Sequence, residues 1–131
     1  MPRIRPRHAL LGTLVYTLIV IAALVMPAGT PHVQRGYLLD FSYGRRLVAD
    51  VAINVVIFVP IGWGLCRAAR RSGGSSRIPW LVAVVLAAVF SLLMETVQAW
   101  LPNRYSSAAD VMANTLGAAI GAFLEGRHER A

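Results

Sequence analysis

Residues 80–101 read WLVAVVLAAVFSLLMETVQAWL, an apolar run in which the conspicuous polar residues are Ser91, Glu95 and Gln98. About 20 mostly apolar residues in helical form are enough to cross the hydrocarbon core of a bilayer. The run therefore predicts a transmembrane helix, and the rest of the chain can be compared with it.

Three further apolar runs flank this one. Residues 9–26 (ALLGTLVYTLIVIAALVM) carry no charge, and residues 47–66 (LVADVAINVVIFVPIGWGLC) contain Asp50 and Asn54. Residues 107–124 (SAADVMANTLGAAIGAFL) are rich in Ala and Gly and contain Asp110 and Asn114, so we expect this helix to enter as a hairpin with the third, across the turn 102–106. The prediction is an all-α fold over a single domain, residues 1–131: a multi-pass transmembrane four-helix bundle of two helical hairpins.

The composition favours the same class. Hydrophobic residues make up 56% of the 131 residues and charged residues 15%, whereas soluble domains have about 45–50% apolar and about 25% charged residues. This balance excludes a disordered chain and argues against an ordinary soluble domain. A single cysteine, Cys66, excludes an internal disulfide and a Cys-rich zinc site. We expect no metal site and no cofactor.

The arginines predict the orientation. The chain has a formal net charge of +7, with 13 arginines and no lysine. Nine fall on one side of a four-span chain (Arg3, Arg5, Arg7, Arg67, Arg70, Arg71, Arg77, Arg127, Arg130) and four on the other (Arg35, Arg45, Arg46, Arg104). The positive-inside rule then places both termini in the cytoplasm. This segregation accounts for the basic charge without a nucleic-acid partner.

A cleaved signal peptide at the N-terminus is disfavoured, because the first apolar run exceeds 7–15 residues and no A-x-A site follows it.

The polar residues inside the runs share helical faces. An ionisable group within a span is costly and is therefore a functional-site hypothesis. Spacings of three and four residues align each set on one face: Asp50 and Asn54; Ser91, Glu95 and Gln98; Asp110, Asn114, Gly117 and Gly121. We expect all these polar groups to face the bundle interior in the outer half of the membrane. There they would form one pocket, with Arg104 pairing with Asp110 or Glu95.

The two halves of the chain also share a short pattern. Residues 49–54 read ADVAIN and residues 109–114 read ADVMAN, which favours a repeat of two hairpins, although two Ala-rich helices can match by chance. Pro60, followed by Gly62, is expected to kink the second helix. Gly117 and Gly121 form a small-x3-small pattern that lets a neighbouring helix approach closely.

These residues resemble the VanZ-like family. The resemblance lies in Asp50-x3-Asn54-x3-Phe58-x-Pro60-x-Gly62, then Ser91-x3-Glu95-Thr96-x-Gln98, then Arg104-x2-Ser107-x2-Asp110-Val111-x2-Asn114-x2-Gly117-x3-Gly121. It covers the second to fourth helices and implies a multi-pass protein of the bacterial cell membrane. The founding member of the family is associated with low-level teicoplanin resistance, so the resemblance also implies a possible link to antibiotic resistance. Within it, Phe58, Pro60, Gly62, Gly117 and Gly121 are interpreted as packing or kink positions.

Three functions remain open at this stage. The first is a protein of the cell envelope whose outward polar pocket binds a lipid-linked or amphiphilic molecule. The second is a membrane-embedded hydrolase or transferase that acts on a lipid-linked substrate. Its carboxylates would do acid–base work, or Glu95, Asp110 and Asp50 would hold a divalent cation, although His8, His32 and His128 all lie outside the spans. The third is a small transporter subunit, which would need an oligomer because four helices make a narrow pore.

Overall fold

The computed structural model describes residues 6–25, 44–70, 77–101 and 107–128. This part of the chain is helical and contains no strand. The four helices are α1 (Pro6–Val25), α2 (Gly44–Ala69), α3 (Arg77–Gln98) and α4 (Ala108–His128). The prediction of an all-α fold with four helices is therefore confirmed. Three boundaries differ notably: α2 is longer at both ends than residues 47–66, α3 ends before residue 101, and α4 continues past residue 124.

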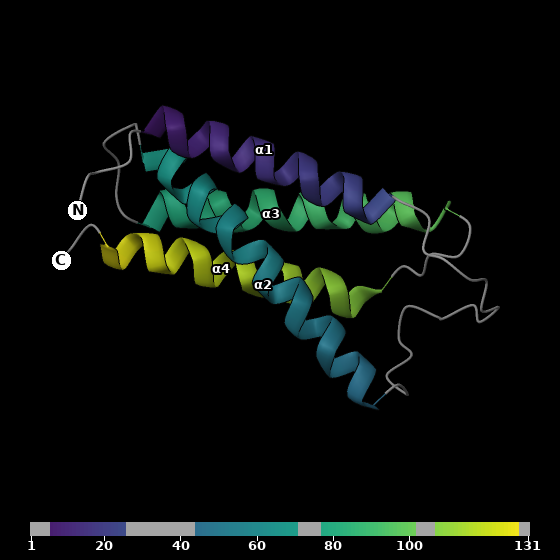
Figure 1. The fold of residues 1–131 in the computed structure, drawn as a ribbon. Coiled ribbons are helices and arrows are strands. Elements are labelled where there is room, and N and C mark those ends of the chain that lie inside the picture. The colour runs from purple at the N-terminus through teal and green to yellow at the C-terminus, as the bar shows by residue number, and fades with distance from the viewer. Residues whose placement is uncertain (1–5, 26–43, 71–76, 102–106, 129–131) are drawn as a thin grey trace.

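The helices form one elongated bundle (Figure 1). At one end, here named the termini end, α1 and α3 begin and α2 and α4 end. At the opposite end, named the distal end, α1 and α3 end and α2 and α4 begin. α2 crosses the bundle and contacts all three other helices, most extensively α4. Towards its beginning α2 diverges from the rest of the bundle.

Local sequence accounts for where the helices begin. Pro6 is the first residue of α1, and Pro79 lies in the first turn of α3, where a missing backbone N–H leaves no hydrogen bond unmade. Before α4, the carbonyl of Ser107 accepts hydrogen bonds from the backbone N–H groups of Asp110 (3.1 Å) and Val111 (3.3 Å). Pro60, in contrast, lies inside the continuous helix α2.

Glycines bring α2 and α4 into backbone contact. A Cβ built on Gly62 would meet the backbone of Ala118, and one on Gly117 would meet the carbonyl oxygen of Val55. A Cβ on Gly121 would likewise meet the carbonyl oxygen of Val59. The contacts of Gly117 with Val55 and of Gly121 with Val59 advance together along the two helices, so α2 and α4 run parallel. Only residues without a side chain allow helices to approach this closely, and the α2–α4 pair is the centre of the bundle.

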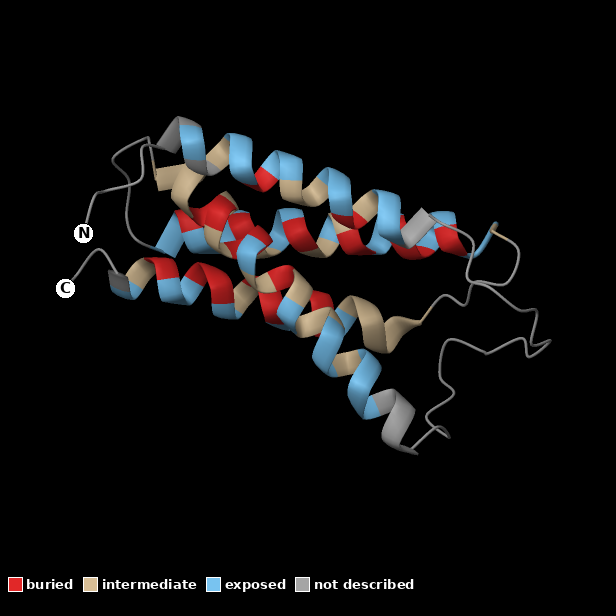
Figure 2. Ribbon diagram, in the orientation of Figure 1, coloured by how far each residue is buried: buried red, intermediate tan, exposed pale blue. Residues whose placement is uncertain are grey.

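The bundle has small and polar residues inside and large apolar residues outside (Figure 2). Its buried residues include Ala83, Ala87, Ala118, Ala122 and Ser91, with Phe58 and Ile61 as the large members. The ring centroids of Phe58 and Phe90 lie 5.9 Å apart. Exposed large side chains run along the whole of α3: Ile78, Leu81, Val82, Val85, Leu86, Val89, Leu92, Leu93, Val97. Soluble proteins bury such residues, whereas helices that pack within lipid place small residues at their contacts.

Within the described ranges, two helices are long and apolar enough to cross a membrane: residues Val48–Ala69 of α2, and α3. In α1 the apolar segment Leu10–Ala23 is shorter. Together with the apolar exterior, this supports a membrane protein. That the first and fourth helices also cross the bilayer stays a prediction.

Candidate functional site

A buried carboxylate from α3 lies against the beginning of α4. Oε2 of Glu95, from the last turn of α3, accepts a hydrogen bond of 2.7 Å from the backbone N–H of Ser107. The Glu95 residue is only 6% exposed. N–H groups at the start of a helix give it a partial positive charge, which the carboxylate of Glu95 complements. The contact fixes the distal end of α3 against the start of α4.

A second carboxylate, that of Asp110, lies in the first turn of α4. Asp110 is half-buried, and its carboxylate is hydrogen-bonded to the side chain of Asn54 on α2. The Asp50 carboxylate, one turn earlier on α2, is close enough for its charge to act on Asp110. Two acids from parallel helices therefore lie at the distal end with one amide between α2 and α4.

One turn deeper, α3 and α4 are joined by a buried polar pair. Nδ2 of Asn114 donates a hydrogen bond of 2.8 Å to Oγ of Ser91. Both residues are buried. Oδ1 of Asn114 is also buried, and within the described residues it accepts no hydrogen bond. A buried acceptor without a partner costs about 1–3 kcal/mol, so Asn114 has spare capacity for a donor.

These residues are named here the distal polar cluster: Asp50, Asn54, Ser91, Glu95, Asp110 and Asn114. Gln98 is buried at the end of α3. The spacing of Asp50 and Asn54 predicts that Asp50 faces the interior of the bundle, but its side chain is exposed. The reason is the divergence of α2, which leaves its first turns with few neighbours (Figures 1 and 2). Arg104 and its predicted ion pair lie outside the described residues.

The distal polar cluster consists mainly of hydrogen-bond acceptors. Carboxylates accept hydrogen bonds and carry negative charge, and each amide adds one acceptor and two donors. Such a set suits a group that donates hydrogen bonds, for example a sugar hydroxyl, an amide or an amine. Among the described residues, no three His, Cys, Asp or Glu side chains gather closely enough to hold a metal ion.

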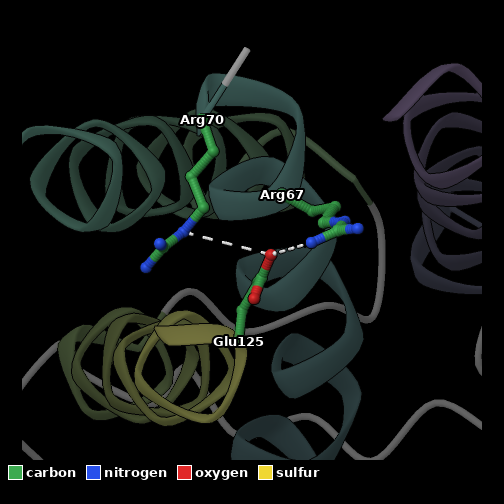
Figure 3. Close-up of polar contacts among 3 residues, drawn as sticks. All are labelled: Arg67, Arg70 and Glu125. Atoms are coloured by element: carbon green, nitrogen blue, oxygen red, sulfur yellow. Dashed lines mark hydrogen bonds and ion pairs between the residues drawn. The ribbon is translucent and has the colours of Figure 1, made fainter. Parts of the chain in front are cut away.

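A buried ion pair at the termini end was missed by the sequence reasoning (Figure 3). Oε1 of Glu125, near the end of α4, lies 3.0 Å from Nη1 of Arg67 and 3.9 Å from Nε of Arg70. Arg67 is in the last turn of α2, and Arg70 directly follows its last residue, Ala69. The Glu125 side chain is fully buried, and the two arginines are 11% and 18% exposed. The contact joins the ends of α2 and α4, just as Asn54 and Asp110 join their beginnings.

The pattern of α4 contained a signal for this pair. Glu125 lies four residues after Gly121 and eight after Gly117, so it continues the stripe that packs against α2. It was missed because the predicted span ends at residue 124, and an acid just beyond an apolar run is usually solvated.

Comparison with known proteins identifies the family of the chain. The model of the VanZ/LLP1 family matches residues 10–125, most of the chain. The comparisons with curated proteins and with solved structures each found no match. The matched region includes all the residues of the distal polar cluster as well as Arg67, Arg70 and Glu125, and on this match the chain belongs to the VanZ/LLP1 family.

Proposed function

We propose that this protein is a multi-pass protein of the bacterial cell membrane that binds a lipid-linked or amphiphilic envelope molecule at its distal polar cluster. The arrangement proposed is four spans, with both termini in the cytoplasm and the cluster on the outer side. Arginine counts support this orientation, since the side assigned to the cytoplasm carries nine and the other side four.

The half-buried carboxylate of Asp110 is the observation that carries the proposal. It is fixed by Asn54 and lies near Asp50, while Asn114, four residues on, has a buried oxygen with no hydrogen bond among the described residues. Two neighbouring acids repel each other, so a donor group that lies between them would be stabilised by both. Exposed apolar residues close by, such as Ile53 and Met112, give an attached acyl or prenyl chain a surface to contact.

A link to glycopeptide resistance belongs to the same proposal. An amphiphilic drug such as teicoplanin and a lipid-linked envelope precursor share a polar head and an apolar tail, and the distal polar cluster would accept hydrogen bonds from the head of either.

The test is a binding titration of the full chain in neutral detergent. The probe is a short-chain prenyl diphosphate that carries one sugar, and the sugar-free prenyl diphosphate serves as reference. We expect the sugar-bearing probe to bind more tightly, and Asp110→Asn to weaken its binding about ten-fold, because a hydrogen bond to a charged group is worth about 1.5–3 kcal/mol.

Thr96→Val is the matched control. Thr96 is an exposed polar residue beside Glu95, and its hydroxyl donates to the carbonyl of Leu92 on its own helix. This variant should bind the probe as the wild type does. Equal binding of both probes, or unchanged binding by Asp110→Asn, would contradict the proposal. Cleavage of the probe would instead favour the enzyme alternative.

A further inference from the structure

A second candidate site lies at the opposite end of the bundle from the distal polar cluster. There a partly open cavity of about 210 Å³ lies among the ends of α2 and α4 and the start of α3. Three arginines line the cavity: Arg70 directly after α2, Arg77 at the start of α3 and Arg127 near the end of α4. The other lining residues are apolar or aromatic: Trp80, Ala122, Phe123 and Gly126.

The cavity is strongly positive. Arg77 and Arg127 are exposed, and within the described ranges neither forms an ion pair. The Arg127 guanidinium lies over the Phe123 ring, 5.7 Å from its centroid. Arg70 has its Nε 3.9 Å from the Glu125 carboxylate, which Arg67 already contacts at 3.0 Å. The lining residues include three arginines and no carboxylate, so the cavity has a net positive charge.

The walls of the cavity are held in place by contacts between helices. Nε1 of Trp80 donates a hydrogen bond of 3.2 Å to the carbonyl of Ala119 on α4, which fixes the indole across the α3–α4 contact. A Cβ built on Gly126 would lie 3.1 Å from Nη2 of Arg70. Glycine at this position therefore leaves room for the Arg70 guanidinium beside α4.

We infer that this cavity binds the phosphate group of an anionic phospholipid. The planar guanidinium group matches phosphate and can donate two parallel hydrogen bonds to it. Exposed apolar side chains continue from the cavity along α4, among them Ile120 and Leu124, so acyl chains have a surface to lie on. Basic pockets between membrane helices on the cytoplasmic side are suited to acidic headgroups. This site is independent of ligand binding at the distal polar cluster.

The experiment titrates the full chain in neutral detergent with dihexanoyl phosphatidylglycerol, followed by calorimetry. Dihexanoyl phosphatidylcholine and inorganic phosphate are the comparison ligands. We expect phosphatidylglycerol to bind at least ten-fold more tightly than either. The double variant Arg77→Gln/Arg127→Gln should lose at least ten-fold in affinity for it. The matched control is Arg45→Gln/Arg46→Gln, which removes the same charge at the start of α2, at the distal end, and should stay within two-fold of the wild type.

A third variant separates the cavity from general surface charge. Gly126→Leu keeps every charge but fills the space beside Arg70, and it should weaken phosphatidylglycerol binding by a similar factor. Equal losses in the two double variants, or unchanged binding by Gly126→Leu, would show that the anion binds elsewhere and would overturn the inference. Equally tight binding of inorganic phosphate or of phosphatidylcholine would overturn it too, since the ligand would then not be recognised as an anionic lipid.

Discussion

Among the residues that the structure describes, two carboxylates are buried, and each is held by a different kind of partner. Glu95 accepts a hydrogen bond from the backbone N–H of Ser107 at the start of α4, whereas Glu125 lies against the guanidinium of Arg67. Breaking a buried ion pair by removing one partner is strongly destabilising, because the remaining charge keeps its desolvation penalty. The stability of the termini end should therefore depend on Glu125.

Glu125→Gln is expected to lower the free energy of unfolding by about 3–5 kcal/mol, since Arg67 would keep a buried charge without its counter-ion. Chemical unfolding of the purified protein in detergent measures this change. Asp50→Asn removes the same charge from an exposed position and should change stability by no more than about 0.5 kcal/mol. Equal stability of Glu125→Gln and wild type would show that the ion pair contributes nothing.

At the scale of single residues, the sequence predicted which polar residues face the interior better than it predicted their contacts. The spacing of Ser91, Glu95 and Asn114 placed these residues on inward faces, and the structure buries all three. It could not predict that Asp50 is exposed, because exposure there depends on the angle at which α2 leaves the bundle and not on any local pattern. Glu125 was missed because its burial depends on Arg67 of α2 lying at the same height along the bundle.

At the scale of elements, the parallel pair α2–α4 organises the molecule. Gly62, Gly117 and Gly121 allow backbone contact between the two helices, and polar bridges join them at both ends. The small-x3-small pattern indicated that some helix approaches α4 closely. Which helix it is could not be read from the pattern, since Gly and Ala faces occur on several of the helices.

Gly121→Ala is expected to destabilise the protein by about 1–3 kcal/mol, the usual cost of overpacking. The added methyl group would meet the carbonyl oxygen of Val59, so the two backbones would have to separate. Gly12→Ala in α1 is the matched control, because nothing lies within 4 Å of a Cβ at that position. There the better helix propensity of Ala should stabilise by up to about 1 kcal/mol. If both variants shift the free energy of unfolding in the same direction, the inference that α2 and α4 approach closely at Gly121 is wrong.

For the molecule as a whole, the distal polar cluster and the arginine-lined cavity lie at opposite ends of the bundle. The distal end contains the carboxylates of Asp50, Asp110 and the buried Glu95, and the termini end contains Arg70, Arg77 and Arg127 around one cavity. Between them lies an exterior of large apolar side chains over a core of small ones. Because α2 and α4 run parallel, the matching segments ADVAIN and ADVMAN lie at the same end.

The fold class followed from the sequence because apolar runs of bilayer length have few alternatives to helices. The resemblance in spaced polar residues likewise identified the family that the family model shows. The pairing of the helices did not follow, since hairpin connections place α2 beside α1 and α4 beside α3, whereas the most extensive contact joins α2 to α4.

The central claim is that this bundle spans the membrane with its termini in the cytoplasm and its distal polar cluster outside. The most direct test is labelling of intact cells with a membrane-impermeant maleimide. The protein would carry Cys66→Ala together with either Gly36→Cys, between the first two helices, or Gly73→Cys, between the second and third. We predict labelling at position 36 in intact cells, and at position 73 only after the cells are opened. Labelling at position 73 in intact cells would contradict the account.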